Sequence, residues 1–589
     1  MPHFRTFMAS SLLALTAAAP AAAQSIDRVV AFGDSYADTG NLKAILGPFF
    51  PSDEYPTGRF SGGTNFVDSL AAHYNVPELD FAVGGAEAGS GNVVLPGLPG
   101  FQQQWQSFVA SGQTFSPNDL LALSVGGNDA RGYRTTGTLA GADAAATATA
   151  AEATTGIDAL VKLGVKRMVF IVGDTGQLPE AIGQANAAIG TAFSVDYNAK
   201  MQVSLAPIAK AGTTVAYVDI TQIGNVVRAD PARFGFIDVT HACPQTCLGN
   251  PALQSQYFFY VDGVHLTSAA FALVADYAIN ALAAPYSFRA TGDLPLLAAQ
   301  NFGRSLNARL DLARGHVGKD GLSTYGFFTG DGGHRDSDGA ANGYDYRSWG
   351  GLGGVEYRAG PAMVGAMFSY DRSHDDSIDA DRTKARSYQI GGYGQVAMGP
   401  LFAQGYAGYG WHHLDITRTG VADPLTASPR AKSWVAGGRA GYLSSLGPVR
   451  IGPVVGLDYA HSKLDGYTET GDVAAALIVG SQHVDTLVGS AGAELRYALL
   501  DRITPWVRLT AEKTLEGDGR SVYYANINAP GVVNGFAIPD SSKKVYGAVA
   551  GGMQAALTSH ISLEATIRTD FSRKEGDDTS GFGGVRLSF

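Results

Sequence analysis

The chain has 589 residues, a formal net charge of −11, 76 glycines and two cysteines. Its length exceeds what one hydrophobic core usually organises, so we expect more than one domain. The acidic balance, without a basic block or stripe, argues against nucleic acid as a partner, because phosphate binding needs clustered lysine and arginine.

The N-terminus has the features of a secretory signal. It begins MPHFR, continues with an apolar run over 6–19 and ends in three alanines at 21–23. These are a basic start, a hydrophobic core and an A-x-A-like cleavage site, so we expect residues 1–23 to be removed before Gln24. A transmembrane anchor is disfavoured, because the apolar run is shorter than the roughly 20 residues that cross a bilayer.

The following half of the chain alternates short apolar runs with helical stretches. Candidate strands lie at 28–32, 79–83, 120–125, 167–172 and 214–220, and the segments 139–163 and 195–211 supply helices. Continuous apolar runs suit strands that are covered on both faces. We therefore predict a three-layer α/β domain with a parallel sheet over residues 24–285, and a site beyond the carboxyl ends of its strands.

The stretch VVAFGDSYADTGN, residues 29–41, places Ser35 at the end of the first of these strands. A serine nucleophile needs an imidazole base and a carboxylate that orients the base. In YVDGVHLTSAA, His265 has Asp262 three residues before it, on a loop that leads into a helix. That spacing lets the carboxylate reach one ring nitrogen while the other nitrogen faces the serine.

Two further turns follow predicted strands and offer hydrogen-bond donors for an oxyanion. FAVGGA (81–86) provides backbone N–H groups at Gly84 and Gly85, and SVGGND (124–129) provides the side-chain amide of Asn128. Taken one at a time, each feature has a plainer interpretation: Ser35 as a helix cap, Asn128 as a turn residue and the glycine pair as a tight strand exit. Their occurrence in order, at strand ends, favours one composite site.

The blocks FGDSYADTGN, FAVGGA, GGND and DGVH resemble, in this order, the four sequence blocks of the GDSL or SGNH family of serine hydrolases and esterases. The resemblance covers about residues 26–284 and implies an ester hydrolase that needs no metal or organic cofactor. The roles that it implies are a nucleophile at Ser35, a base at His265, an orienting carboxylate at Asp262 and an oxyanion hole made by Ser35, Gly85 and Asn128.

This sequence departs from the family pattern at two positions. Tyr36 replaces the leucine that gives the family its name, and we expect this to affect packing behind the nucleophile. Asp80 stands where an asparagine often precedes the second block, which alters local hydrogen bonding. We interpret Asp34, Asp38 and Asn41 as scaffold of the nucleophile turn.

The predicted secretory signal also bears on the redox state of the two cysteines. Cys243 and Cys247 lie in HACPQTC, and an oxidising compartment favours a local disulfide between them. A zinc site would need more ligands than these two thiols and His241, so we predict none.

After about residue 321 the apolar pattern changes to period two. In HISLEATIRTDF (560–571) apolar side chains alternate with polar ones, and twelve such strands can be placed between 322 and 589, joined alternately by short turns and by longer polar loops such as 371–385. An even number of antiparallel strands with this alternation predicts a transmembrane β-barrel, surrounded by outer-membrane lipid. A soluble β-sandwich is the alternative.

The segment between the halves, 286–321, contains a predicted helix over 294–315, with Pro295 near its start and Gly315 at its end. Its surface is mostly polar, which suits a helix that crosses a polar barrel lumen. An ordinary surface linker helix is the alternative.

The helix, the twelve strands and the terminal Phe589 together resemble the translocator domain of bacterial autotransporters, over about residues 290–589. The resemblance implies a hydrolase displayed on the surface of a Gram-negative cell and a barrel inserted by the barrel-assembly machinery. We therefore expect a surface esterase or lipase acting on acyl esters. Alternatives are a lysophospholipase or acyltransferase on the same residues, a non-catalytic adhesin, and an open pore.

Overall fold

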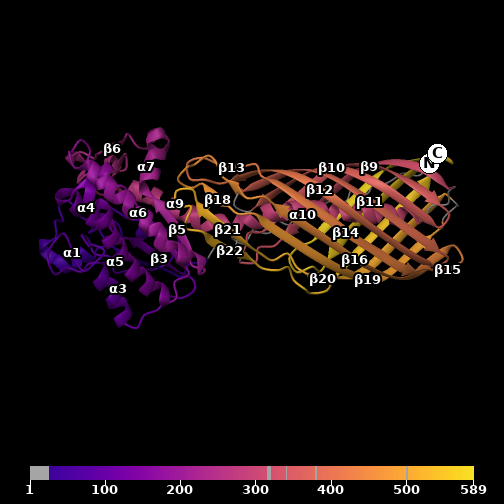
Figure 1. Ribbon diagram of the computed structural model, residues 1–589, viewed down its shortest axis with the longest axis horizontal. Helices are drawn as coiled ribbons and strands as arrows, with labels where there is room; N and C mark the ends of the chain where they lie inside the picture. Colours follow the sequence, from indigo (N-terminus) through magenta and orange to yellow (C-terminus); the bar gives the residue numbers. More distant parts are fainter. Residues whose placement is uncertain (1–24, 315–319, 340, 378–380, 499–501) are drawn as a thin grey trace, which may run out of the picture.

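The computed structural model describes residues 25–314, 320–339, 341–377, 381–498 and 502–589. The predicted signal at 1–23 and the predicted helix end at Gly315 lie outside these ranges. The described chain forms an α/β domain and a β-barrel that lie end to end, with a helix passing from the first into the second (Figure 1).

A parallel five-stranded sheet forms the centre of the α/β domain, in the order β2-β1-β3-β4-β5. Its strands are β1 Arg28–Gly33, β2 Glu78–Asp80, β3 Asp119–Ser124, β4 Arg167–Val172 and β5 Thr214–Asp219. The middle strands are buried along nearly their whole length, as continuous apolar runs predict. The predicted parallel sheet is confirmed.

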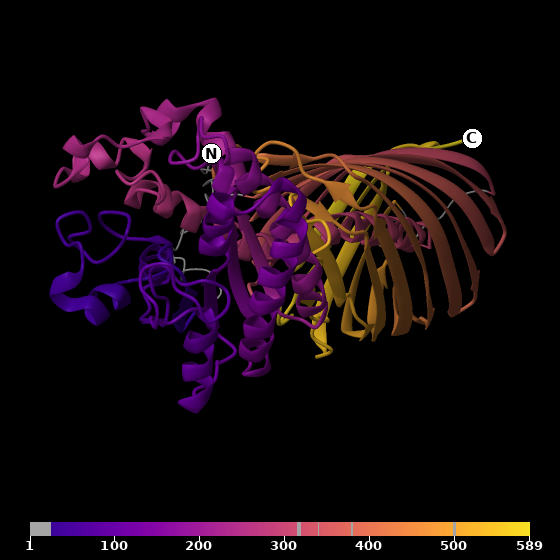
Figure 2. The same cartoon turned by 60° about the vertical axis from the view of Figure 1, so that its left-hand side comes forward.

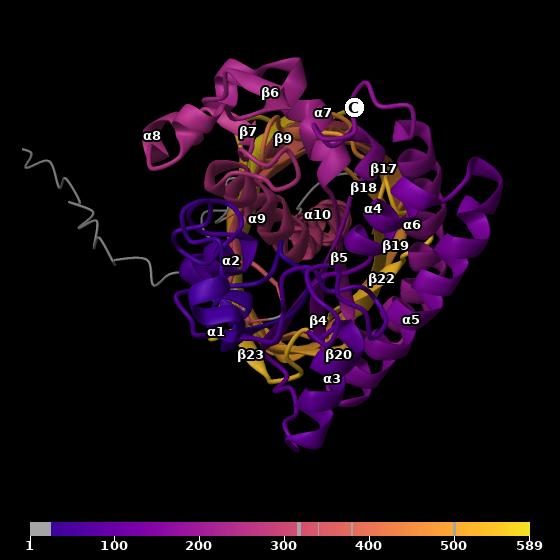
Figure 3. The same cartoon turned by 90° about the vertical axis from the view of Figure 1, so that its left-hand side faces the viewer.

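Helices cover both faces of this sheet and give three layers (Figure 3). One face packs against α2 Phe66–Tyr74, α7 Ile220–Ala229 and α9 Ser268–Ala283, and the other against α3 Phe101–Ala110, α5 Ala142–Lys162 and α6 Ala187–Lys210. The smaller elements are α1 Asn41–Leu46, α4 Gly127–Thr136, β6 Asp238–Ala242, α8 Pro251–Gln254 and β7 Tyr257–Phe259.

Twelve antiparallel strands close into the barrel in the described part of the chain, because β11 pairs with both β10 and β12. They are β8 Gly321–Arg335, β9 Tyr344–Ala359, β10 Ala362–Ser377, β11 Arg382–Met398, β12 Leu401–Arg418, β14 Arg430–Tyr442, β16 Val449–Leu464, β19 Gln482–Tyr497, β20 Ile503–Glu516, β23 Tyr546–Ala556, β24 Ile561–Phe571 and β25 Asp578–Ser588. Short strands β13 Leu425–Ala427 and β15 Ser444–Leu446 pair beside them. The predicted barrel is confirmed.

The two faces of the barrel wall differ as the period-two pattern predicts. On β24, Leu563 and Ile567 are exposed on the outside, while Ser562 and Glu564 are buried on the inside. An apolar outer face and a polar lumen are the features of a wall that stands in lipid.

The helix α10, Phe288–Ala313, occupies the lumen, where the strands surround it (Figures 1 and 2). Its Arg309 forms paired bonds of 2.8 Å with Glu356 and a further bond with Glu564. Asp311 accepts from Arg508 at 2.7 Å. Buried charges that are paired in this way fix the helix to the wall, which excludes the surface-linker alternative and disfavours an open pore.

Loops at one end of the barrel reach the α/β domain. They form a small sheet of β17 Tyr467–Thr468, β18 Leu477–Val479, β21 Arg520–Asn526 and β22 Asn534–Ile538. The Asn534 amide accepts from the Val215 N–H at 2.8 Å and donates to the Val215 carbonyl at 3.1 Å. This side chain therefore satisfies the edge strand β5 as a further strand would.

Two sequence predictions are wrong at the barrel. The described residues of the predicted loop 371–385 are mostly strand, since β10 extends to Ser377 and β11 begins at Arg382; residues 378–380 lie outside the described ranges. Opposite charges on paired strands, such as Asp376 and Arg382 at 2.8 Å, let the strands continue beyond the apolar band. The lumen helix starts at Phe288, so Pro295 lies inside it; contacts with the wall outweigh the proline's disruption of the helix.

Candidate active site

The turn that carries Ser35 depends on the glycine at the end of β1. Gly33 has φ of +124°, and a Cβ there would lie 1.9 Å from the Ser124 carbonyl oxygen of the neighbouring strand, so only glycine fits. Both Gly33 backbone groups bond the Gln104 side chain at 2.8 Å. Ser35 follows at the carboxyl edge of the sheet. The cap of α1 is Gly40, so Ser35 is no helix cap.

Three predicted residues meet in one hydrogen-bonded series. Nε2 of His265 lies 2.6 Å from Oγ of Ser35, and Nδ1 of His265 lies 2.6 Å from Oδ2 of Asp262. Ser35 and His265 are buried. Asp262 and His265 stand in the connection from β7 to α9, whose N-cap is Thr267, so strand pairing at one end and the cap at the other hold this connection in place.

Asp262 accepts four hydrogen bonds. Its Oδ1 accepts from the backbone N–H groups of Val264 at 2.8 Å and His265 at 2.9 Å, and its Oδ2 accepts from the Tyr55 hydroxyl at 2.7 Å as well as facing the imidazole. Burial opposes the charge, but His265 and these donors hold the pKa of Asp262 well below its usual range. The carboxylate therefore stays ionised beside the imidazole.

Sequence reasoning missed Tyr55. It lies in the irregular stretch PSDEYPTGRFSGG, which has no apolar period and no recognisable motif. Its ring packs with Phe60, and the Phe60 ring stacks on His265 with centroids 5.0 Å apart. This aromatic cluster closes the outer side of the imidazole.

The predicted oxyanion donors differ in whether they already donate a hydrogen bond within the protein. The Gly84 N–H donates to Oδ2 of Asp38 at 2.7 Å and is therefore committed to the scaffold. Among the described residues, the backbone N–H groups of Gly85 and Ser35 have no hydrogen-bond acceptor. Nδ2 of Asn128 donates to the Ala86 carbonyl at 2.9 Å, which ties α4 to the Gly85 turn and leaves a second amide hydrogen.

Two buried aspartates accept hydrogen bonds from backbone N–H groups of the turn that carries Ser35. Oδ1 of Asp34 accepts from the Ser124 hydroxyl at 2.8 Å and from the Tyr36 N–H at 3.1 Å, and burial raises the pKa of Asp34 to about 6. Asp38 accepts from the N–H groups of Gly40, Asn41 and Leu42. These contacts agree with a scaffold role.

Tyr36 and Asp80, the two departures from the family pattern, both make hydrogen bonds near the nucleophile turn. The Tyr36 hydroxyl donates to the Val264 carbonyl at 2.8 Å, so this residue links the nucleophile turn to the loop of His265. Asp80 accepts from the N–H and hydroxyl of Thr39 and from the amide of Asn41. It supports the nucleophile turn from β2.

A second aspartate and histidine share the spacing of Asp262 and His265. Nδ1 of His241 lies 2.9 Å from Oδ2 of Asp238, but the His241 side chain is 75% exposed. Spacing alone therefore does not identify the pair at the site; burial and contact with Ser35 do.

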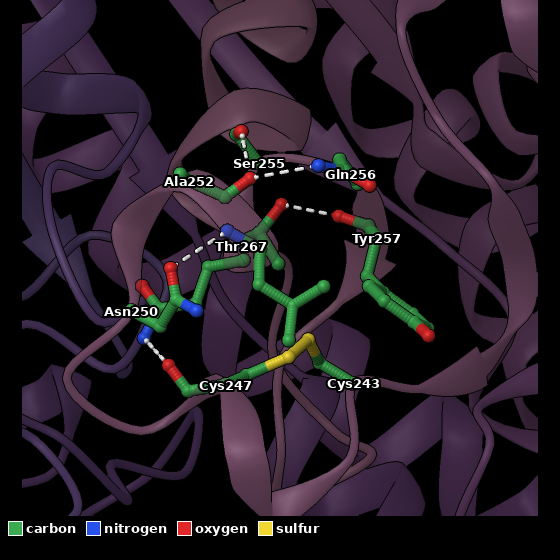
Figure 4. The surroundings of a disulfide bond; sticks show 10 residues. Cys243, Cys247, Asn250, Ala252, Ser255, Gln256, Tyr257 and Thr267 are labelled. Atoms are coloured by element: carbon green, nitrogen blue, oxygen red, sulfur yellow. Dashed lines mark hydrogen bonds between the residues drawn. A yellow bond between two sulfur atoms is a disulfide. The ribbon is translucent and has the colours of Figure 1, made fainter.

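Cys243 and Cys247 form a disulfide bond that closes the short loop before α8 (Figure 4). Both sulfur-bearing side chains pack in the cluster that contains Tyr55, Phe60 and Tyr260. The disulfide therefore packs in the same hydrophobic cluster as Phe60, whose ring stacks on His265.

The sheet topology and the Ser–His–Asp series define a serine hydrolase of the α/β type, joined to a transmembrane barrel. Residues 29–278 match the family of GDSL-like lipases and acylhydrolases, and residues 324–568 match the autotransporter β-domain. The first match covers the α/β domain and the second covers the barrel: the chain is an autotransporter with a GDSL lipase passenger, displayed from the outer membrane.

Named relatives agree with this assignment. Lipase 1 of Photorhabdus luminescens is 22% identical over 583 residues, which cover 83% of this chain and 86% of that protein. Esterase EstA of Pseudomonas aeruginosa is 24% identical over 450 residues, which cover 70% of this chain and 66% of that protein. The chain is therefore a surface-exported carboxylic ester hydrolase.

The chain is also similar to solved autotransporter structures. The translocator domain of the autotransporter NalP from Neisseria meningitidis is 20% identical, covers 51% of this chain and 98% of its own length, and has a TM-score of 0.42. The transport unit of AIDA-I from Escherichia coli is 14% identical, covers 49% and 99%, and has a TM-score of 0.35.

Proposed function

We propose that Ser35 is the nucleophile of this esterase, with His265 as general base and Asp262 as the group that orients and stabilises the imidazole. The observation that carries the proposal is the series of two 2.6 Å contacts from Ser35 through His265 to Asp262. An ionised Asp262 keeps the proton of His265 on Nδ1, so that Nε2 is free to accept the serine proton.

Acylation and deacylation follow from this geometry. Oγ of Ser35 attacks the ester carbonyl carbon while its proton moves to Nε2 of His265, and the imidazolium then gives that proton to the leaving alkoxide. Water replaces the alcohol, loses a proton to His265 and attacks the acyl-enzyme. The carboxylic acid leaves, and Ser35 recovers its proton.

The negative oxygen of the tetrahedral intermediate needs donors that are already in place. We assign this role to the N–H groups of Ser35 and Gly85 and to the side-chain amide of Asn128, supported by their lack of competing acceptors or by their spare hydrogen. Donors of this type contribute a factor of about 10²–10³ each to the rate.

We further propose the division of the chain into a signal at 1–23, a passenger at 24–285, a linker with the lumen helix at 286–321 and the barrel at 322–589. The ends of α9 at Ala283 and of α10 at Ala313, and the start of β8 at Gly321, support these boundaries. Insertion by the barrel-assembly machinery is part of this proposal and is supported by the match to the autotransporter β-domain. The substrates we propose are acyl esters, including lipids.

The test is hydrolysis of a short-chain chromogenic ester by intact Gram-negative cells that display Ser35→Ala, Ser90→Ala or the unchanged chain at matched surface levels. Ser90 is exposed and its side chain takes no part in the series. We expect Ser35→Ala to lose a factor of about 10⁴ or more and Ser90→Ala to retain full activity. Equal activity in all three would remove Ser35 from the mechanism.

A further inference from the structure

A cavity of about 110 Å³ opens beside Ser35, and its described lining includes neither Tyr55 nor Phe60 of the aromatic cluster. It passes between the loop that follows β4 and the helix α7, and reaches β7. Apolar groups form much of its wall, and those used below are Ile171, Leu178, Ile220, Val239 and Phe258.

Two glycines face this space from opposite sides. Gly224 is buried in the middle of α7, where a Cβ would meet only the Phe258 ring among the described residues, at 4.0 Å. A Cβ on Gly173, after β4, would touch Ile220 and Thr221 at 3.9 Å. Neither glycine has a positive φ, and glycine weakens a helix. Backbone conformation therefore does not explain Gly224, whereas an open cavity does.

The polar side chains along the wall are already engaged with the protein. Nδ2 of Asn198 donates to the Gly173 carbonyl at 3.2 Å, and Oδ1 of Asp174 accepts from the Gly176 N–H at 2.8 Å. Arg131, near Ser35, forms paired bonds of 2.7 and 2.9 Å with Glu180. These partners engage the polar groups named here, and the apolar groups of the wall suit an apolar occupant of the remaining space.

The position of the cavity decides which part of an ester it receives. Ser35 and Asn128 line it, but His265 is not among the described residues that do so. Because His265 must protonate the leaving alkoxide, the alcohol lies on the imidazole side. The acyl chain of the ester bonded to Ser35 then extends into the cavity.

We propose that this cavity is the acyl-chain site, that it accepts aliphatic acyl groups longer than butyryl, and that Gly224 and Gly173 set the accepted length by leaving their side of the wall empty. The proposal rests on Ser35 as nucleophile. A leucine at 224 would occupy the space opposite Phe258. Each methylene kept out of an apolar site lowers kcat/KM about fourfold.

The experiment compares p-nitrophenyl butyrate, octanoate and laurate as substrates of the full-length chain in detergent. The variants are Gly224→Leu, Gly224→Ala and Gly132→Leu. Gly132 is a matched control, because it lies in a helix near the site, is exposed, and has nothing within 4 Å of its Cβ position. Each change improves helix propensity, but only those at 224 enter the cavity.

We expect Gly224→Leu to lower the octanoate-to-butyrate ratio of kcat/KM tenfold or more, Gly224→Ala to lower it less, and Gly132→Leu to leave it unchanged. An unchanged ratio in folded Gly224→Leu and Gly224→Ala would overturn the proposal. If Gly224→Leu does not fold, the graded loss in Gly224→Ala decides. Labelling of the unchanged chain with diethyl p-nitrophenyl phosphate separates the two proposals. Ser35 would attack phosphorus, release p-nitrophenolate and become diethylphosphorylated, so absence of phosphorylation at Ser35 would refute the nucleophile.

Discussion

Replacing Asp262 by asparagine tests how the carboxylate acts. An amide has one acceptor oxygen, and the backbone N–H groups of Val264 and His265 hold that oxygen at the Oδ1 position. The new NH₂ group must then face Nδ1 of His265. Because a donor now meets Nδ1, the imidazole carries its proton on Nε2 and donates to Ser35 instead of accepting from it.

The size of the effect follows from two losses. The contact of 2.6 Å between Asp262 and His265 is charge-assisted, and such a bond contributes about 1.5–3 kcal/mol. The wrong tautomer also removes the base, and the combined loss for a buried Ser–His–Asp series is about 10⁴-fold in kcat, or roughly 5 kcal/mol. We expect KM to change little, because Asp262 does not touch the acyl chain.

The assay is steady-state hydrolysis of p-nitrophenyl butyrate by the detergent-solubilised full-length chain. Asp238→Asn is the matched control, since Asp238 accepts from two backbone N–H groups and faces His241 in the same arrangement at an exposed position. A loss smaller than tenfold in Asp262→Asn, or an equal loss in Asp238→Asn, would refute the tautomer argument.

Two further predictions concern stability, followed by urea unfolding and fluorescence of Trp105, which is the one tryptophan of residues 24–285. The asparagine of Asp34→Asn keeps an acceptor oxygen for the Ser124 hydroxyl and the Tyr36 N–H. In the unchanged chain, burial raises the native pKa of Asp34 to about 6. The protonated carboxyl group therefore contributes its full stability below about pH 4, and this contribution is lost as pH rises through 6. The variant should therefore gain about 3 kcal/mol relative to the unchanged chain between about pH 4 and 7, and parallel pH curves would contradict this. Asn534→Ala leaves both backbone groups of Val215 unpaired and should cost the passenger about 1–3 kcal/mol. Asn528→Ala, which removes one hydrogen bond to the Val473 carbonyl at a half-buried position, should cost less.

Local pattern was sufficient for much of this protein. Continuous apolar runs predicted the parallel sheet, and period-two alternation predicted twelve barrel strands, because burial on both faces or on one face imposes those patterns directly. The pattern gave wrong element bounds where polar residues or a proline lie inside an element and not in a loop or at a helix end. The charged residues 371–377 and 382–385 belong to two paired strands, β10 and β11. Pro295 lies within α10 because the barrel wall supports the helix.

The site divides in the same way. Four ordered blocks in the sequence predict Ser35, Gly85, Asn128 and His265 as site residues, since the chemistry demands those residue types at strand ends. Tyr55 and the difference between His265 and the equally spaced His241 depend on tertiary structure.

The acyl cavity and the bond from Asn534 to β5 also depend on it. The reason is physical. Residue type and local period determine what a segment can do, but which distant side chains share a buried space depends on how the elements pack, and no single segment carries that information.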